Sequence, residues 1–272
     1  MNNNPIGVFD SGVGGLSVLK SIRERLPHED LIYIADLLYV PYGDKSQQLI
    51  EQRAINLSYF LIQHNVKAIV VACNTATVTA IKKLRSLISI PIIGIEPGVK
   101  PASLSTKTGS IGVLATSRTL KSDSFSQLLN NWVAQHRVEL QACPGLVEQV
   151  ESLDLNGPKT RRLLKQYIDP LLEKGVDTLV LGCTHYPFLI PLIREICDHS
   201  TDVIDTGPAV AREVERRLQV AQLLSSKKTL GYESFWSSAA TDSTTKIIGQ
   251  LWGDAVNVSL MDNQEIKVSE LC

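Results

Sequence analysis

Short apolar runs alternate with longer amphipathic stretches along most of this chain. Runs such as 6–9, 68–72 and 178–181 are rich in Val, Ile and Leu, and each ends at small or polar residues. Stretches such as 46–64 and 158–174 carry apolar residues at helical spacing instead. Buried strands that alternate with helices are typical of parallel sheets covered by helices. The pattern therefore predicts an α/β fold.

The expected elements follow this alternation from the N-terminus to about residue 224. Strands are predicted at 6–9, 30–35, 68–72, 92–95, 110–115, 138–142, 178–181 and 203–205. Helices are predicted after the glycine-rich turn 10–15 as far as residue 25, and at 46–64, 75–87, 121–131, 146–152, 158–174, 187–197 and 207–224. The less patterned tail has a possible strand at 232–236, a helix at 244–251 and a strand at 256–261.

Three strand ends recur at nearly constant spacing. VKAIVVACNT begins at Val66 and VDTLVLGCTH at Val176, so that Cys73 and Cys183 lie 110 residues apart. IGVFDS at residue 6 returns as IGVLAT at residue 111, and IEPG at residue 95 returns as IDTG at residue 204. Matched segments in the same order indicate an internal duplication.

The duplication predicts two pseudo-symmetric parallel-sheet α/β domains with the active site in the cleft between them. Pro97, Gly98 and Pro101 mark the passage into the second half, and the helix from Gly207 leads back to the first. The expected domains are therefore 1–97 with 208–272, and 98–207.

Composition narrows the classes of function. The 272 residues include 27 basic and 28 acidic side chains, a balance that favours neither nucleic acid nor an anionic membrane as partner. No apolar run approaches the roughly 20 residues that span a bilayer, and MNNNPIGVFD lacks the features of a signal peptide. We therefore expect a cytoplasmic protein. Its five cysteines read as free thiols, and their spacings match no structural zinc site.

Cys73 and Cys183 are the candidate reactive residues. Most single buried cysteines serve packing alone, and Cys143, Cys197 and Cys272 keep that interpretation. Cys73 and Cys183 differ because each follows a strand and precedes a polar pair at a predicted helix start. A residue that follows a strand lies at the carboxyl edge of the sheet, where open α/β sheets bind ligands. A helix N-terminus favours the thiolate form of a cysteine over the thiol.

Two facing thiols predict inversion of a stereocentre. If a small anionic substrate lay between the halves, one thiol could remove a proton from one face while the other supplied a proton to the opposite face. Asp10 and His185 are the candidate assistants. Asp10 and Ser11 are equally well explained by helix capping, and a lone histidine such as His185 is more often structural. The glycines at 12–15 are weak evidence for a nucleotide site, since they do not form Gly-x-Gly-x-x-Gly.

The segments DSGVGGLSVL, PYGDKS, ACNTAT, GCTHYP and DTGPAVA, in this order, resemble those of bacterial glutamate racemases in the aspartate/glutamate racemase superfamily. The resemblance covers most of residues 6–218. It implies interconversion of L- and D-glutamate without a cofactor or metal, supplying D-glutamate for peptidoglycan and the cell wall. It leaves the oligomeric state open, a homodimer being one outcome.

The resemblance also implies roles for individual residues. Cys73 and Cys183 would be the two acid–base residues, assisted by Asp10 and His185. The auxiliary glutamate of the family follows a Cys-Pro strand end, which places it at Glu151, with Glu148 close by. Residues expected to contact the substrate are Asp10, Ser11, Tyr42, Gly43, Asn74, Thr75, Thr184 and His185.

Three other functions compete with this interpretation. A racemase of the same superfamily could act on aspartate or a hydantoin. A non-catalytic two-lobed protein that binds a small anion would share the architecture, although a periplasmic binder needs an export signal that MNNNPIGVFD does not provide. A nucleotide-dependent enzyme depends only on the glycines at 12–15.

Overall fold

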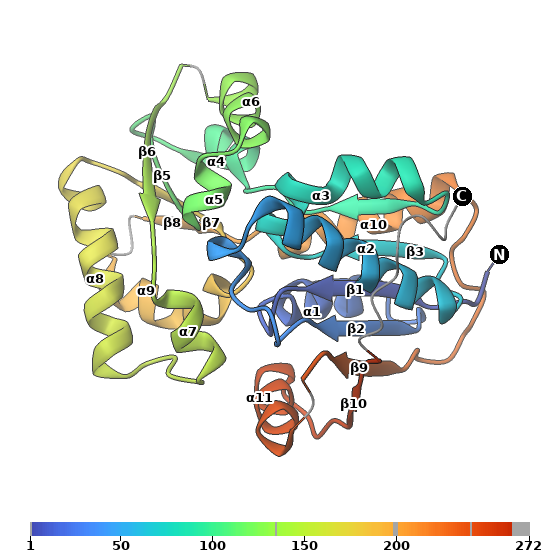
Figure 1. Ribbon diagram of the computed structural model, residues 1–272. Coiled ribbons are helices and arrows are strands. Elements are labelled where there is room, and N and C mark those ends of the chain that lie inside the picture. Colours follow the sequence, from blue (N-terminus) through green and yellow to red (C-terminus); the bar gives the residue numbers. More distant parts are fainter. Residues whose placement is uncertain (1, 134, 198–200, 240, 263–272) are drawn as a thin grey trace. The chain divides into compact units, whose positions relative to one another are not determined.

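The computed structural model describes residues 2–133, 135–197, 201–239 and 241–262, so Cys272 lies outside the described residues. The chain forms two compact units, and Figure 1 shows their elements. Unit 1 comprises Met1–Ile95 and Gly207–Cys272, and unit 2 comprises Glu96–Thr206. The domain boundaries expected from the sequence stand one or two residues from these.

Unit 1 is built on a six-stranded sheet in which every pair of neighbours is parallel. Its order is β10-β9-β2-β1-β3-β4. The strands are β1 Ile6–Asp10, β2 Leu31–Ala35, β3 Ala68–Val71, β4 Ile92–Gly94, β9 Glu233–Ser237 and β10 Val258–Leu260. The central strands β1, β2 and β3 are buried along their whole length, as expected of a parallel sheet with both faces covered.

Helices cover both faces of this sheet. Those of unit 1 are α1 Leu16–Arg25, α2 Gln47–Gln63, α3 Asn74–Leu87, α10 Gly207–Val220 and α11 Asp242–Trp252, with a 3-10 turn, η1, at Tyr42–Asp44. On one face, Leu57 of α2 and Ala80 of α3 pack with Phe9 and Val71 in one buried cluster. On the other, α1 and α10 pack against each other.

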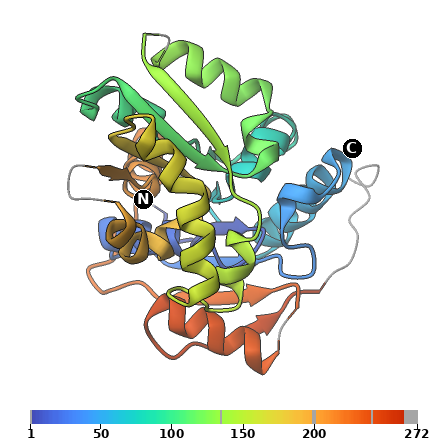
Figure 2. The same cartoon turned by 90° about the vertical axis from the view of Figure 1, so that its left-hand side faces the viewer.

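Unit 2 repeats the plan with four parallel strands in the order β6-β5-β7-β8. They are β5 Ser110–Ala115, β6 Arg137–Ala142, β7 Thr178–Gly182 and β8 Asp202–Ile204. Its helices are α4 Val99–Ser105, α5 Ser117–Leu120, α6 Asp123–Trp132, α7 Leu146–Glu151, α8 Pro158–Glu173 and α9 Ile190–Ile196, with η2 at Tyr186–Leu189. Figure 2 shows α8 (yellow) in front of β6 (green), whereas α4 and α6 pack with β5 and β7 on the other face.

The two sheets share one strand order. β2-β1-β3-β4 and β6-β5-β7-β8 are the same arrangement, and the repeated segments occupy matching strands. Register matches as well, because Asp10 pairs with Ala35 at the end of β1 as Ala115 pairs with Ala142 at the end of β5. The prediction of two related parallel-sheet α/β halves is confirmed.

The structure differs from the expected elements mainly beside prolines and at short turns. Pro97, Gly98 and Pro101 were expected to mark only a crossing, yet α4 begins directly after Gly98. Pro101 lies in its first turn, where no intrahelical N–H bond is lost. The segment Ser117–Leu120 is also a short helix, and the helix expected at 187–197 opens with a 3-10 turn. α10 ends at Val220 rather than residue 224, because Gln222 adopts φ 56°.

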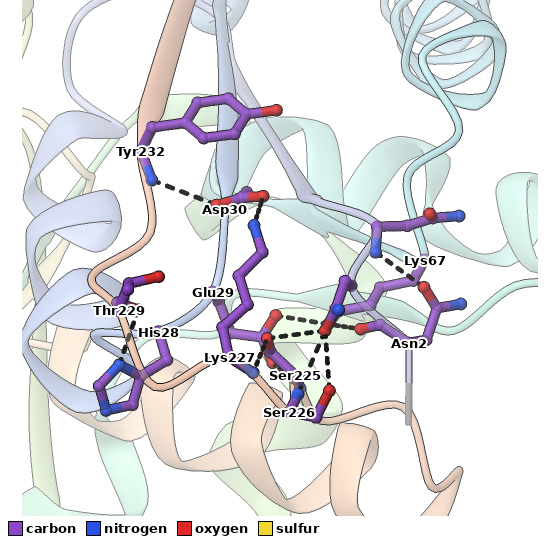
Figure 3. A network of polar contacts seen from close by, with 12 residues as sticks. Asn2, His28, Glu29, Asp30, Lys67, Ser225, Ser226, Lys227, Thr229 and Tyr232 are labelled. Carbon is purple, nitrogen blue, oxygen red and sulfur yellow. Dashed lines mark hydrogen bonds and ion pairs between the residues drawn. The ribbon is translucent and has the colours of Figure 1, made fainter.

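The chain after α10 extends the first sheet. β9 pairs with β2, β10 pairs with β9, and both are red in Figure 1. The connection to β9 is tied to the amino edge of the sheet by the polar network in Figure 3. There Glu29 Oε1 accepts from the N–H of Ser225 at 2.7 Å, Asp30 pairs with Lys227, and Lys67 pairs with Glu29. Among the described residues, no helix combines the length and apolar character needed to cross a bilayer.

We predict that Asp177 holds the loop before β5 in place. Its carboxylate accepts from the Thr106 hydroxyl at 2.6 Å and from the N–H groups of Lys107 and Thr108, each at 2.7 Å. Although burial opposes the charge, these bonds lower the pKa of Asp177 to about 2. Asp177→Ala should therefore cost about 1–3 kcal/mol of unfolding free energy at neutral pH, measured by urea denaturation.

The lowered pKa of Asp177 also fixes how the stability difference should change with pH. A depressed carboxyl pKa stabilises the fold at pH values above the ordinary pKa of aspartate, about 3.9, and the contribution disappears as pH falls toward 2. The difference between wild type and Asp177→Ala should therefore shrink on acidification. A difference that stays constant between pH 6 and pH 2 would show that the charge of Asp177 is not responsible.

Candidate functional site

The carboxyl ends of the strands in unit 1 collect several predicted site residues at one edge of the sheet. β1 lies between β2 and β3, so Asp10 and Ser11 leave the sheet between Asp36 and Cys73. All four side chains are buried. Parallel strands put their carboxyl ends on the same side, where open α/β sheets bind ligands.

Cys73 stands at the junction of β3 and α3. It is the N-cap residue of α3, its sulfur accepts from the N–H of Ala76 at 3.4 Å, and its thiol donates to the Ser11 hydroxyl at 3.6 Å. Only 5% of Cys73 is exposed. A sulfur at this position feels the positive end of the helix dipole, which favours negative charge on it.

The first residues of α3 add groups that can hold a small anion. Asn74 and Thr75 are buried, and among the described residues neither the amide nitrogen nor the amide oxygen of Asn74 has a hydrogen-bond partner. Buried polar groups are rarely left unsatisfied, so a pair of them beside a helix N-terminus indicates a place for a polar ligand.

Asp10 is completely buried and makes a contact of the capping type. Its Oδ2 accepts from the N–H of Gly15, 2.7 Å away, just before α1. A Cβ on Gly15 would stand 2.6 Å from the Cβ of Asp10, so only glycine permits this approach. The capping interpretation therefore has a geometric basis, and it does not exclude a second role.

Tyr42 and Gly43 form the start of η1, in the segment between β2 and α2. The Tyr42 side chain is buried in the same apolar cluster as Cys73. Its hydroxyl donates to Asp36 Oδ2 at 2.5 Å, and Arg53 donates to both oxygens of Asp36, at 3.0 and 2.8 Å. Neither Asp36 nor Arg53 is among the site residues predicted from the sequence.

In unit 2 the site residues form a chain of contacts that starts at Cys183. This cysteine directly follows β7, and its sulfur lies 3.7 Å from His185 Nδ1. The other ring nitrogen, Nε2, lies 2.7 Å from Glu151 Oε1 at the end of α7. Of the two candidate glutamates, Glu151 is therefore the one that contacts His185, whereas Glu148 is exposed.

The charge of His185 follows from this arrangement. Burial disfavours an imidazolium, but the hydrogen bonds to Cys183 and Glu151 outweigh it and raise the pKa of His185 well above its ordinary value. A protonated ring then stands between a sulfur and a carboxylate. Such a ring stabilises negative charge on the sulfur. Thr184, between the two residues, is also buried.

Cys143 and Cys197 were expected to be packing residues, and both are buried free thiols. The Cys143 thiol donates to the carbonyl of Gln141 at 3.4 Å, and burial raises the pKa of Cys143 far above the usual range. Cys143 therefore stays protonated at neutral pH. In the part of the chain that the structure describes, no group of three or more His, Cys, Asp or Glu side chains could hold a metal ion.

The structure thus assembles two partial sites, one in each unit. In unit 1, Cys73 contacts Ser11, and Tyr42 packs in the same cluster. In unit 2, Cys183 contacts His185, and His185 contacts Glu151. The opposition of the two cysteines stays a prediction. Asp36 could have been found as the polar residue after the second strand, and Arg53 as the charge on the apolar face of the helix 46–64.

Comparison with known proteins identifies the family of this chain. The family model described as Asp/Glu/Hydantoin racemase matches residues 6–214. A glutamate racemase from Methylococcus capsulatus is 51% identical over 251 residues, which cover 92% of this chain and 93% of the relative.

Solved structures of glutamate racemases share the fold. An isoform from Bacillus anthracis superposes with a TM-score of 0.88 at 34% identity, covering 97% of this chain and 99% of the other. The Escherichia coli enzyme, solved in complex with L-glutamate and the activator UDP-MurNAc-ala, has a TM-score of 0.83 at 31% identity and covers 94% and 98%. This chain therefore belongs to the Asp/Glu/hydantoin racemase family, and it is an isomerase that acts as an amino-acid racemase.

Proposed function

We propose that this enzyme interconverts L- and D-glutamate by a two-base mechanism in which Cys73 and Cys183 act on opposite faces of the α-carbon. The observation that carries the proposal is the repeat itself. In each unit a cysteine follows the corresponding strand, β3 or β7, and lies beside polar groups at the carboxyl edge of a parallel sheet. The glutamate bound in the E. coli relative supports the choice of substrate.

The reaction requires one proton to leave and another to arrive. In our proposal, one cysteine as thiolate removes the α-proton of glutamate and becomes a thiol. The carbanion that remains is planar, and the thiol of the other cysteine protonates its opposite face and becomes a thiolate. The exchange of roles allows the reverse reaction, and no cofactor or metal takes part in this scheme.

Binding and assistance are assigned to the residues around each cysteine. The N–H groups at the start of α3 and the Asn74 amide suit a carboxylate of the substrate. We assign further substrate contacts to Asp10, Ser11, Tyr42, Gly43, Thr75, Thr184 and His185. Asp10 assists proton transfer at Cys73, and the His185–Glu151 pair assists it at Cys183. The groups next to the two sulfurs differ. Cys183 has a cationic neighbour, while Cys73 donates to a neutral hydroxyl.

We further propose a cytoplasmic location and a role in supplying D-glutamate for peptidoglycan. These two points depend on the family resemblance. Aspartate or a hydantoin as substrate is the alternative within the family, and assays with each compound in parallel separate them.

The two-base mechanism makes a prediction about each cysteine. Cys73→Ser and Cys183→Ser should each lower kcat of racemisation at least about 10²-fold in both directions, because serine is too weak an acid to replace the thiol. Each variant keeps one cysteine, so any exchange of the α-proton with D₂O should be confined to one enantiomer. The two variants should prefer opposite enantiomers, which NMR can follow.

Cys143→Ser and Cys197→Ser are matched controls, since both residues are buried free thiols of unit 2. Cys143 lies at the same sheet edge as Cys183, and Cys197 follows α9. Each folded control should racemise within about threefold of the wild-type rate, an effect far below that of a positioned acid–base group. Exchange of the same enantiomer by both site variants, or near wild-type racemisation by either, would disprove the facing-cysteine mechanism.

The His185–Glu151 pair should act as a unit. His185→Asn should lower kcat by about 10²–10⁴-fold. Glu151→Gln should lower it less, and it should add nothing in the His185→Asn background, because coupled residues are not additive. Loss of the carboxylate should also lower the pKa of His185, so the alkaline limb of the pH–rate profile should move to lower pH in Glu151→Gln.

Glu148→Gln is the control for these variants, because Glu148 lies one turn before Glu151 on the same helix and is exposed. It should leave kcat and the pH profile unchanged. Additive losses in the His185→Asn/Glu151→Gln double variant would mean that Glu151 works independently of His185.

Asp10 offers a test between catalysis and capping. Asp10→Asn keeps an oxygen that can accept from the Gly15 N–H but removes the charge. If Asp10 assists proton transfer, kcat should fall about 10²–10⁴-fold with a much smaller change in KM and in melting temperature. If Asp10 only caps, Asp10→Ala should cost about 1 kcal/mol of stability and both variants should turn over normally.

A further inference from the structure

A buried ion pair next to the proposed site has no part in the mechanism above. Arg53 is only 2% exposed although it carries a charge, and its partner Asp36 is not exposed at all. The guanidinium donates through two nitrogens to the two carboxylate oxygens, a bidentate arrangement that fixes both side chains. Removing two charges from water costs desolvation free energy, so a buried pair of this kind needs a structural or functional reason.

The third member of the cluster is Tyr42. Its hydroxyl donates to Asp36 Oδ2 at 2.5 Å, and its side chain belongs to the buried cluster that includes Cys73. Burial, and then the negative charge of Asp36, raise the pKa of Tyr42 well above its ordinary value. The phenol therefore keeps its proton and stays bound to Asp36.

Backbone hydrogen bonds connect the Asp36–Arg53 pair to the segment between β2 and α2. The N–H of Asp36 donates to the carbonyl of Asp10 at 3.0 Å, and the N–H of Tyr39 donates to the carbonyl of Asp36 at 3.0 Å. The Arg53 guanidinium also lies 4.3 Å from the centre of the Tyr39 ring. Contacts with the end of β1 and with Arg53 of α2 therefore hold the 36–45 segment in place.

We infer that Asp36 and Arg53 are positioning residues, whose ion pair holds the turn of Tyr42 and Gly43 against the Cys73 end of the first sheet, where that turn contacts the substrate. The inference rests on the proposed function, because it uses Tyr42 and Gly43 as substrate contacts. Neither Asp36 nor Arg53 touches the reacting atoms. Their effect should therefore appear in substrate binding rather than in proton transfer.

The same sheet provides a matched control at its opposite edge. Glu29 precedes β2, as Asp36 follows it, and pairs with Lys67, which precedes β3. Figure 3 draws Glu29 and Lys67 within their polar network. Both side chains are nearly completely buried, as are those of the Asp36–Arg53 pair. The Glu29–Lys67 pair is therefore similar in chemistry and burial but stands at the amino ends of the strands, away from Cys73.

The test compares Asp36→Asn and Arg53→Lys with Glu29→Gln, using melting temperature, kcat and KM for both enantiomers. All three should melt below wild type. Asp36→Asn should raise KM at least tenfold, about 1.4 kcal/mol, and leave kcat within about threefold, because the lost contacts bind substrate and transition state alike. Arg53→Lys should raise KM about threefold, since lysine keeps the charge but not the paired bonds. Glu29→Gln should leave KM unchanged.

A second readout does not depend on the substrate. Trypsin can cut after Lys45, at the end of the positioned segment, and after Lys83 on α3. The ratio of the first cleavage rate to the second should rise at least fivefold in Asp36→Asn, a shift of about 1 kcal/mol in local opening. It should stay at the wild-type value in Glu29→Gln. If Asp36→Asn does not fold, KM and the cleavage ratio are measured on Arg53→Lys instead.

The outcomes separate the inference from the proposed function. An unchanged KM and an unchanged cleavage ratio in folded Asp36→Asn, or equal changes in Glu29→Gln, would overturn the positioning role. A wild-type enzyme that does not racemise glutamate would overturn the proposed function instead. In that case the cleavage ratio still decides whether the pair holds the turn.

Discussion

The constraint on which this structure depends is that parallel strands bring all their carboxyl ends to one edge of a sheet. Residues far apart in the chain, such as Asp10, Asp36 and Cys73, therefore leave unit 1 side by side. The same rule in unit 2 brings Cys143 and Cys183 to one edge. Helix N-termini begin at this edge, so polar and negatively charged groups there meet unsatisfied N–H donors.

The two units share a frame but not its chemistry. The position of Asp10 at the end of β1 corresponds to Ala115 in β5, and Asp36 after β2 corresponds to Cys143 after β6. Unit 2 therefore has no carboxylate at either strand end. It has Glu151 on α7 instead, and this carboxylate contacts His185 rather than a sulfur. A cysteine after the third strand of each unit, Cys73 or Cys183, is common to the two edges.

Buried charge occurs at both edges of the first sheet, with different surroundings. The Glu29–Lys67 pair at the amino edge joins a network that ties down the chain before β9. The Asp36–Arg53 pair at the carboxyl edge holds a tyrosine beside a cysteine. Pairs of this kind add little net stability compared with apolar packing. In the inference above, the value of the Asp36–Arg53 pair lies in the geometry that it fixes.

The sequence by itself determined the strands, most helices, the duplication and the two cysteines. Apolar runs and glycine turns are local signals, and the echo of VVACNT in VLGCTH needs no folded chain to be seen. Local patterns were less reliable beside prolines. The short helix α4 was missed because Pro101 is compatible with a first helical turn as well as with a break.

Only the tertiary structure decided which side chains meet. The sequence favoured Glu151 over Glu148 only through the family resemblance. In the structure Glu151 contacts His185, whereas Glu148 is exposed. Arg53 occupies an apolar helix face, where a charge makes sense only once Asp36 and Tyr42, from another part of the chain, are seen opposite it. Periodicity records which face of an element is buried, whereas the partners of a buried polar group depend on long-range packing, which no local pattern contains.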